Sequence, residues 1–255
     1  MTELDKKLNQ ICIGGYVKFE VVFEDITSIS EDEYQQARMD WIGASDSSKL
    51  LNVNPFSEHP YDDLIEEKAY RKVDEEISKK ASVRMGKDLE PLIINKLTEV
   101  FNNLIKPANM YGNKEFGLEV NFDGVIVEDD TAIPVEIKTV TKWGKKYYNL
   151  DKSIKYQEDG IWKDGIYNPK LLDIDTSISY EEAADYYGIP VYYYTQLQQQ
   201  MMALNSEKGY LAILDTDKWN VHIFLIRKQL KCWEELLEKS KVAITKIRTI
   251  RSLHK

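Results

Sequence analysis

Two short segments of the chain carry residue types that bind hard metal ions and activate water. Asp123-Gly124 lies at the end of one predicted strand, and Glu136-Ile137-Lys138 lies within the next. Because Glu136 and Lys138 are two positions apart, a strand projects both from the same face. Carboxylates from adjacent strands can converge on one Mg²⁺, which prefers oxygen ligands. The backbone carbonyl of Ile137 can add a third oxygen.

Such a site performs metal-assisted hydrolysis of a phosphodiester. The metal ion stabilises charge that develops on the phosphoryl group, while Lys138 can orient the attacking water or help to deprotonate it. An isolated Glu-x-Lys on a strand is more often a surface charge pair, so the preceding Asp-Gly adds weight to the motif. Glu90 lies in line with apolar residues of a predicted helix, where a carboxylate needs a partner. It would complete an acidic cluster.

Apolar periodicity predicts the elements that must position these residues. Residues 88–104 have apolar side chains at helical spacing, with Pro91 near the first turn. Residues 116–140 alternate in polarity and predict a β-hairpin or meander that holds both motif segments. Further helices are expected at 30–39, 61–80, 192–204 and 229–250, and strands at 209–214 and 219–226.

The remaining segments complete a single domain that spans residues 1–255. Residues 1–33 are expected to form an N-terminal strand extension, because 11–24 has short β-branched runs around a Gly-Gly turn. Residues 141–188 show no clean period and are interpreted as an insertion of long loops with a helix near 180–187. Residues 228–255 are expected to form a C-terminal helix.

Composition narrows the class of protein. The chain has 255 residues, 43% of them hydrophobic, which is enough for a sizeable core. The net charge of −9 is unusual for a nucleic-acid protein, but Lys and Arg concentrate in 142–155 and 227–255. Two cysteines cannot supply an iron–sulfur or zinc site, and the scattered histidines match no ligand spacing. No apolar run is long enough to cross a bilayer, so a cytoplasmic location is expected, with no membrane partner.

Four segments, in this order, resemble the bacteriophage lambda exonuclease and YqaJ-type viral recombinase nucleases, a family of PD-(D/E)xK enzymes. Residues 38–46 (RMDWIGASD) are similar to its R-x-x-x-I-x-x-S segment, and residues 85–91 (MGKDLEP) to its G-x-x-x-E helix. The Asp-Gly and Glu-Ile-Lys pair follows. Residues 193–198 (YYTQLQ) are similar to the Y-x-x-Q-x-Q helix. Each segment is weak alone, and the order makes the signal specific.

The resemblance implies an α/β (α+β) fold with a restriction-endonuclease-like core, in which a central mixed β-sheet is flanked by helices. It assigns the reaction centre to residues that serve the metal ion or the attacking water, namely Glu90, Asp123, Glu136, Lys138 and Gln196. It also implies that Arg38 and Ser45 bind the 5′-phosphate of a DNA end. Arginine suits forked phosphate contacts, and serine can donate a further hydrogen bond.

The activity implied is a Mg²⁺-dependent exonuclease, with Mn²⁺ as a substitute, that acts on double-stranded DNA ends. It would degrade one strand 5′ to 3′ and leave single strands for phage-type recombination. A single-strand annealing protein and a homo-oligomer, a trimer by resemblance, are implied as partners, in a bacterial host cytoplasm. The stretch between Lys138 and Gln196 is longer than expected for lambda exonuclease. The additional residues are expected either to form a DNA-facing loop or to change the contacts between subunits of the trimer.

Two other functions remain open from the sequence. One is a RecB-like or structure-specific endonuclease with the same metal site, which would nick closed circular DNA. The other is a non-cleaving module that binds DNA ends and keeps the fold. The intact set of Glu90, Asp123, Glu136 and Lys138 argues against the second.

Overall fold

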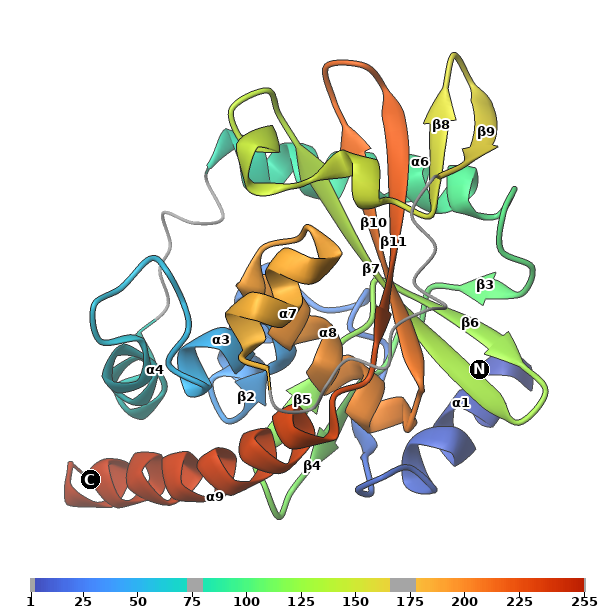
Figure 1. The fold of residues 1–255 in the computed structure, drawn as a ribbon. Coiled ribbons are helices and arrows are strands. Elements are labelled where there is room, and N and C mark those ends of the chain that lie inside the picture. Colours follow the sequence, from blue (N-terminus) through green and yellow to red (C-terminus); the bar gives the residue numbers. More distant parts are fainter. Residues whose placement is uncertain (1–2, 73–79, 166–177, 255) are drawn as a thin grey trace.

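A seven-stranded mixed sheet lies at the centre of the computed structural model, which describes residues 3–72, 80–165 and 178–254 (Figure 1). The strand order is β3-β6-β7-β10-β11-β8-β9. These strands are β3 (Leu104–Ile105), β6 (Gly124–Glu128), β7 (Thr131–Val140), β8 (Lys155–Glu158), β9 (Ile161–Asp164), β10 (Lys208–Asp215) and β11 (Asn220–Arg227). β7 and β10 are parallel, and the other neighbours are antiparallel. The predicted fold class is confirmed.

A second, smaller sheet has the order β1-β4-β5-β2. Its strands are β1 (Glu20–Phe23), β2 (Ile42–Gly43), β4 (Met110–Asn113) and β5 (Leu118–Val120). A 3₁₀ turn at Ala44–Asp46 and the short helix α3 (Ser47–Leu50) follow β2. Residues 121–123 connect β5 to β6, so Asp123 lies where the chain passes from the small sheet to the central sheet.

Two helices cover opposite faces of the central sheet. Val135 and Ile137 of β7 pack in one apolar cluster with Ile93 and Leu97 of α6 (Ala81–Leu97). The alternate residue, Glu136, faces α8 (Val191–Leu204) on the other side and is hydrogen-bonded by that helix. The two-residue period of the strand therefore places Glu136 on the face opposite this apolar cluster. The face covered by α8 holds the candidate site.

The other α-helices surround this core (Figure 1). They are α1 (Glu3–Ile13), α2 (Glu31–Arg38), α4 (Pro60–Ala69), α7 (Tyr180–Tyr187) and α9 (Leu230–Leu253). α2 begins with a capping box in which Ser30 and Glu33 bond each other's backbone. α9 packs along α4. Within the described ranges, no helix combines the length and apolar character needed to span a membrane.

The expected N-terminal strand extension is wrong for its first part. Residues 3–13 form α1, and only Glu20–Phe23 is a strand. Leu8 and Cys12 are one helical turn apart and both fully buried, so the apolar side chains follow a helical period. The charged residues between them occupy the solvent face of α1, which hides that period in a short window.

The helix expected at 88–104 is shifted toward the N-terminus. It begins at Ala81, continues through Pro91 and ends at Leu97. Asn103 has a left-handed conformation, with a φ of 58°, and Leu104 then starts β3. The chain therefore reverses before Leu104, and the apolar residue that extended the helical pattern belongs to a strand.

The insertion at 141–188 contains more regular structure than expected. The helix near 180–187 is confirmed as α7, but β8 and β9 form a hairpin that β8 joins to β11. Asp159 and Gly160 make its turn with φ values of 49° and 80°, as an Asp-Gly hairpin requires. Residues 166–177 lie outside the described ranges. So do residues 73–79 of the helix expected at 61–80, whose described part ends at Ala69.

The C-terminal elements match the sequence predictions closely. α8 begins at Val191, β10 and β11 form the expected antiparallel pair, and α9 occupies the predicted C-terminal helix.

Candidate active site

The carboxylates of Asp123 and Glu136 lie beside the ammonium group of Lys138. The Lys138 Nζ forms an ion pair with Glu136, lies 3.6 Å from Asp123 Oδ2, and donates a 3.1 Å hydrogen bond to the Ile137 carbonyl. Asp123 precedes β6, and the other three residues lie on β7, which pairs with β6. The amide of Ile137 donates a 2.9 Å bond to Asp123 Oδ2. That bond fixes the Asp123 carboxylate against β7.

Two glutamines of α8 hold the Glu136 carboxylate. Gln196 Nε2 donates to Oε1 at 2.6 Å, and Gln200 Nε2 donates to Oε2 at 2.7 Å. The two glutamines are one helical turn apart, so both point from the same face of α8. The sequence predicted Gln196 but missed Gln200. The spacing of four residues between Gln196 and Gln200 could have indicated this role. Gln200, however, is one of three consecutive glutamines, Gln198 to Gln200, all of them buried.

Burial sets the electrostatics of this centre. Glu136 is only 1% exposed. Burial and the neighbouring Asp123 carboxylate raise its pKa to about 7, although Lys138 and Gln200 oppose the shift. Burial alone would lower the pKa of Lys138, but the two carboxylates outweigh it and raise that pKa. The ring of Tyr193, whose centroid is 5.3 Å from Nζ, adds a cation–π contact that the sequence did not indicate.

Glu90 lies near this centre but does not contact Lys138. It reaches from α6, forms an ion pair with Lys106, and is 20% exposed. Glu90 and Asp123 line the same pocket of about 280 Å³, together with Tyr34 and Asn121. Among the residues that the structure describes, no three acidic, histidine or cysteine side chains gather as a metal-binding group. Two carboxylates, those of Asp123 and Glu136, therefore contact Lys138. The third, that of Glu90, lines a pocket together with Asp123.

Arg38 and Ser45 are brought together as a pair. Arg38 Nη2 donates a 2.7 Å hydrogen bond to Ser45 Oγ, and its Nε lies 3.2 Å from Glu119 Oε1. Glu119 is 2% exposed, so it holds the guanidinium of Arg38 from the buried side. The Tyr34 ring lies 5.7 Å from the guanidinium carbon. Ser45 is exposed.

A buried ion pair supports the backbone around Ser45. Lys68 Nζ lies 2.8 Å from Asp46 Oδ2 and contacts the Arg38 carbonyl at 3.3 Å. The same carboxylate accepts a 3.0 Å bond from the Gly43 amide. Burial alone would raise the pKa of Asp46, but Lys68 and Arg38 lower it to about 2.

Gly43 lies directly against the Arg38–Glu119 pair, so a side chain at this position would displace the pair. A Cβ on Gly43 would lie 2.5 Å from Glu119 Oε1 and 2.9 Å from Arg38 Nη2. Neither Glu119 nor Lys68 was predicted from the sequence, because both join the Arg38–Ser45 segment from distant parts of the chain.

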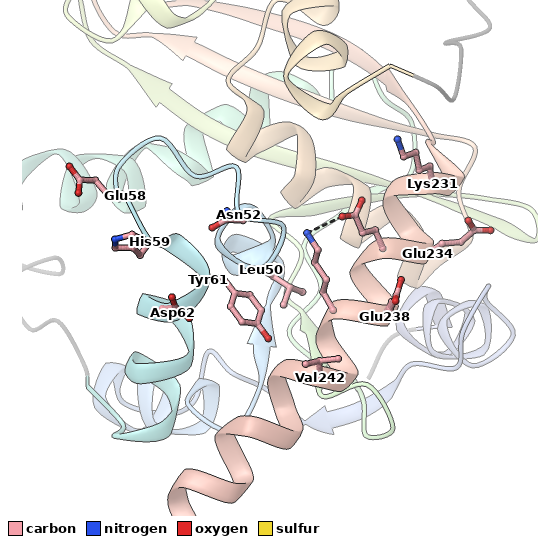
Figure 2. A pocket seen from close by; sticks show the side chains of 12 residues that line it. Leu50, Asn52, Glu58, His59, Tyr61, Asp62, Lys231, Glu234, Glu238 and Val242 are labelled. Atoms are coloured by element: carbon pink, nitrogen blue, oxygen red, sulfur yellow. Dashed lines mark ion pairs between the residues drawn. The ribbon is translucent and has the colours of Figure 1, made fainter.

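A pocket of about 740 Å³ lies away from the predicted site residues, none of which lines it. Figure 2 shows Glu58, His59 and Asp62 on one wall and the α9 residues Glu234 and Glu238 on the other. Five acidic residues and two lysines line it, and one of these lysines, Lys239 of α9, is paired there with Glu235 at 2.9 Å. The net negative charge of this lining repels phosphates, so this pocket is a poorer candidate for the reaction centre than the surroundings of Lys138.

The oxygen atoms around Lys138 form a donor set of the kind that a hard divalent cation binds. Carboxylate oxygens of Asp123 and Glu136 and the Ile137 carbonyl all face one cation, here the lysine ammonium. Mg²⁺ needs few protein ligands because it keeps several waters. The residues present therefore fit a divalent cation in this place.

The family model of the YqaJ-like viral recombinase domain matches residues 33–207, which include all four motif segments. None of the curated proteins compared with the chain matches it.

Two solved structures share the fold. One is an alkaline exonuclease (LHK-Exo) from Laribacter hongkongensis, with 14% identity, a TM-score of 0.57, and coverage of 88% of this chain and 96% of that one. The other is LHK-Exo in complex with dAMP, with 13% identity, a TM-score of 0.58, and coverage of 87% and 95%. The family resemblance inferred from the sequence is thus confirmed.

Proposed function

Because the chain belongs to the YqaJ-like viral recombinase domain family, we propose that it is a deoxyribonuclease that hydrolyses phosphodiester bonds at double-stranded DNA ends. It uses Mg²⁺, for which Mn²⁺ substitutes, and degrades one strand 5′ to 3′. The single strand that remains serves phage-type homologous recombination. LHK-Exo, which shares the fold, is an alkaline exonuclease, and this likeness supports the reaction class.

The observation that carries the proposal is the position of Lys138 between Asp123 and Glu136. In this proposal Asp123, Glu136 and the Ile137 carbonyl hold the metal ion, and Glu90 faces it across the pocket that it shares with Asp123. When bound, the divalent cation polarises the phosphoryl group and stabilises the charge that develops there.

The chain's own groups provide orientation and charge. Lys138 carries its ammonium beside these oxygens and directs the attacking water toward phosphorus. Gln196 and Gln200 restrict the Glu136 carboxylate to one orientation, since each of its oxygens accepts a separate bond. Residues that orient a metal ligand in this way commonly have a strong effect on metal affinity and activity. The burial of Glu136 strengthens each electrostatic contact that its carboxylate makes.

Preference for an end is assigned to Arg38 and Ser45. The Arg38 guanidinium is held by buried Glu119, while Ser45 is exposed beside it. A terminal 5′-phosphate can accept hydrogen bonds from both side chains, as arginine forks commonly donate to phosphate. The proposal extends to a single-strand annealing protein and to further copies of the chain as partners in the cytoplasm of a bacterial host.

Digestion of matched DNA substrates tests this function. Linear duplexes with 5′-phosphate or 5′-hydroxyl ends and a closed circular duplex are incubated with Mg²⁺, with Mn²⁺ or with EDTA. We expect nucleotide release from linear DNA with either metal, faster for the 5′-phosphate, and none from the circle. Nicking of the circle would indicate an endonuclease. Binding of linear DNA without cleavage would indicate a non-catalytic end-binding module.

A further inference from the structure

A positively charged pocket lies where the C-terminal end of α9 meets α2 and α4. It has a volume of about 460 Å³ and is lined by Asp40, Arg71, Arg248, Arg251 and Ser252, together called the arginine pocket. Three guanidinium groups and one carboxylate leave a surplus of positive charge. In a chain with a net charge of −9, such a local surplus attracts anions specifically to this place.

One arginine of the arginine pocket is fixed before any ligand arrives. Arg251 Nη2 donates 2.6 Å hydrogen bonds to the carbonyls of Met39 and Lys68, at the ends of α2 and α4. Its Nη1 lies 2.7 Å from Asp40, which also pairs with Arg71 at 2.5 Å. This network ties three helix ends together, and it accounts for Arg251 and Arg71 as structural residues.

Arg248 has no part in that network. It is exposed on the same side of α9 as Arg251 and Ser252, three and four residues away. Within the described ranges it has no hydrogen-bond or ion-pair partner. Its guanidinium is therefore an uncommitted fork at the rim of a preorganised cationic pocket, and Arg–phosphate contacts use such forks.

The arginine pocket adjoins the segment that carries Arg38. Arg251 binds the Met39 carbonyl, one residue after Arg38, and Lys68 contacts the Arg38 carbonyl. Resting on the proposed function, we infer that the arginine pocket binds a backbone phosphate of the DNA substrate. This contact is separate from the terminal phosphate assigned to Arg38 and Ser45. The shared chemistry is a phosphate group, so a free phosphate ion is the competing source.

The salt dependence of DNA binding tests the inference. Affinity for a fluorescent linear duplex is measured in EDTA, which prevents cleavage, across a series of salt concentrations for the wild type and Arg248→Gln. Each lost phosphate contact on duplex DNA lowers the slope of log K against log salt by about 0.9. We expect Arg248→Gln to bind more weakly, with a slope smaller by about one, and Arg248→Lys to restore the slope.

The matched control is Lys246→Gln on the same helix. It removes one charge, but Lys246 lies over the Tyr61 ring outside the arginine pocket, so the wild-type slope is expected. Equal melting temperatures for the variants establish that each is folded. An unchanged slope in Arg248→Gln overturns the inference, as does an equal loss of slope in Lys246→Gln.

Two further measurements distinguish a free phosphate ion from a DNA backbone phosphate, and failure of the pocket inference from failure of the proposed function. Inorganic phosphate is titrated calorimetrically into the wild type and Arg248→Gln. Phosphate binding that depends on Arg248, with an unchanged DNA slope, would assign the pocket to a free anion and reject a backbone contact. If the wild type cleaves linear DNA while the Arg248→Gln slope is unchanged, only the pocket inference fails. If the wild type neither binds nor cleaves DNA, the proposed function fails with it.

Discussion

Gln200 donates a 2.7 Å hydrogen bond to Oε2 of Glu136. This bond joins α8 to β7 and leaves the carboxylate one orientation, because Gln196 takes its other oxygen. Both Glu136 and Gln200 are fully or almost fully buried. Catalytic competence is therefore expected to depend on the packing of α8 as well as on the motif residues.

Gln200→Ala is expected to weaken Mg²⁺ binding or activity by about 10–100-fold, the usual cost of losing a group that orients a metal ligand. The measurement is the rate of cleavage of linear duplex across a Mg²⁺ titration. Gln199→Ala is the control, because Gln199 is equally buried but bonds the carbonyls of Ile42 and Glu119. Both variants should melt earlier than the wild type. Equal Mg²⁺ dependence in the two variants would contradict the role given to Gln200.

Ser45→Ala is expected to reduce the preference for 5′-phosphorylated over 5′-hydroxyl ends by about tenfold or more. A hydrogen bond to a charged group contributes about 1.5–3 kcal/mol, and Ser45 is exposed beside Arg38. The ratio of initial rates on the two substrates is compared with that of Ser28→Ala, whose hydroxyl bonds only its own turn. A ratio in Ser45→Ala that equals the wild-type ratio would remove Ser45 from the end-binding site.

The buried Asp46 makes stability depend on acid. Its pKa is lowered from 3.8 to about 2, so its contribution to stability is fully present above pH 3.8 and is lost as the pH falls through 2. Between pH 4 and pH 2, the wild type should lose about 2 kcal/mol more unfolding free energy than Asp46→Asn. Chemical denaturation at each pH measures this difference.

Asp159→Asn is the control for that titration, because Asp159 is exposed in the β8–β9 turn. Asn tolerates the same left-handed conformation. The control should follow the wild-type pH dependence. Parallel curves for Asp46→Asn and the wild type would show that the Asp46–Lys68 pair does not govern acid stability.

The sequence was sufficient to predict the parts of the site that depend on local periodicity. A two-residue period placed Glu136 and Lys138 on one face of a strand, and Asp-Gly marked the neighbouring strand. Arg38 and Ser45 were also paired correctly, because they lie within one short motif. Few residues separate Arg38 from Ser45, so local structure alone can bring them together.

Contacts between distant segments could not be predicted in this way. Glu119 meets Arg38 from 81 residues away, and Lys68 meets Asp46 from another element; no spacing encodes either pair. Gln200 was missed because α8 is buried on nearly every side, so an apolar stripe does not reveal which of its polar residues are buried as well. The helical period of α1 and the β8–β9 hairpin were missed because both segments are short and charged.

Lys138→Met tests the central claim most directly. It keeps an unbranched side chain that is one atom shorter and removes the ammonium that Asp123 and Glu136 share. The measurement is Mg²⁺-dependent nucleotide release from linear duplex, alongside DNA affinity in EDTA, with the exposed Lys114→Met as the control. We expect Lys138→Met to lose about 100-fold or more in rate while it still binds DNA, and Lys114→Met to cleave normally. A wild-type rate in Lys138→Met would contradict the assignment of this centre.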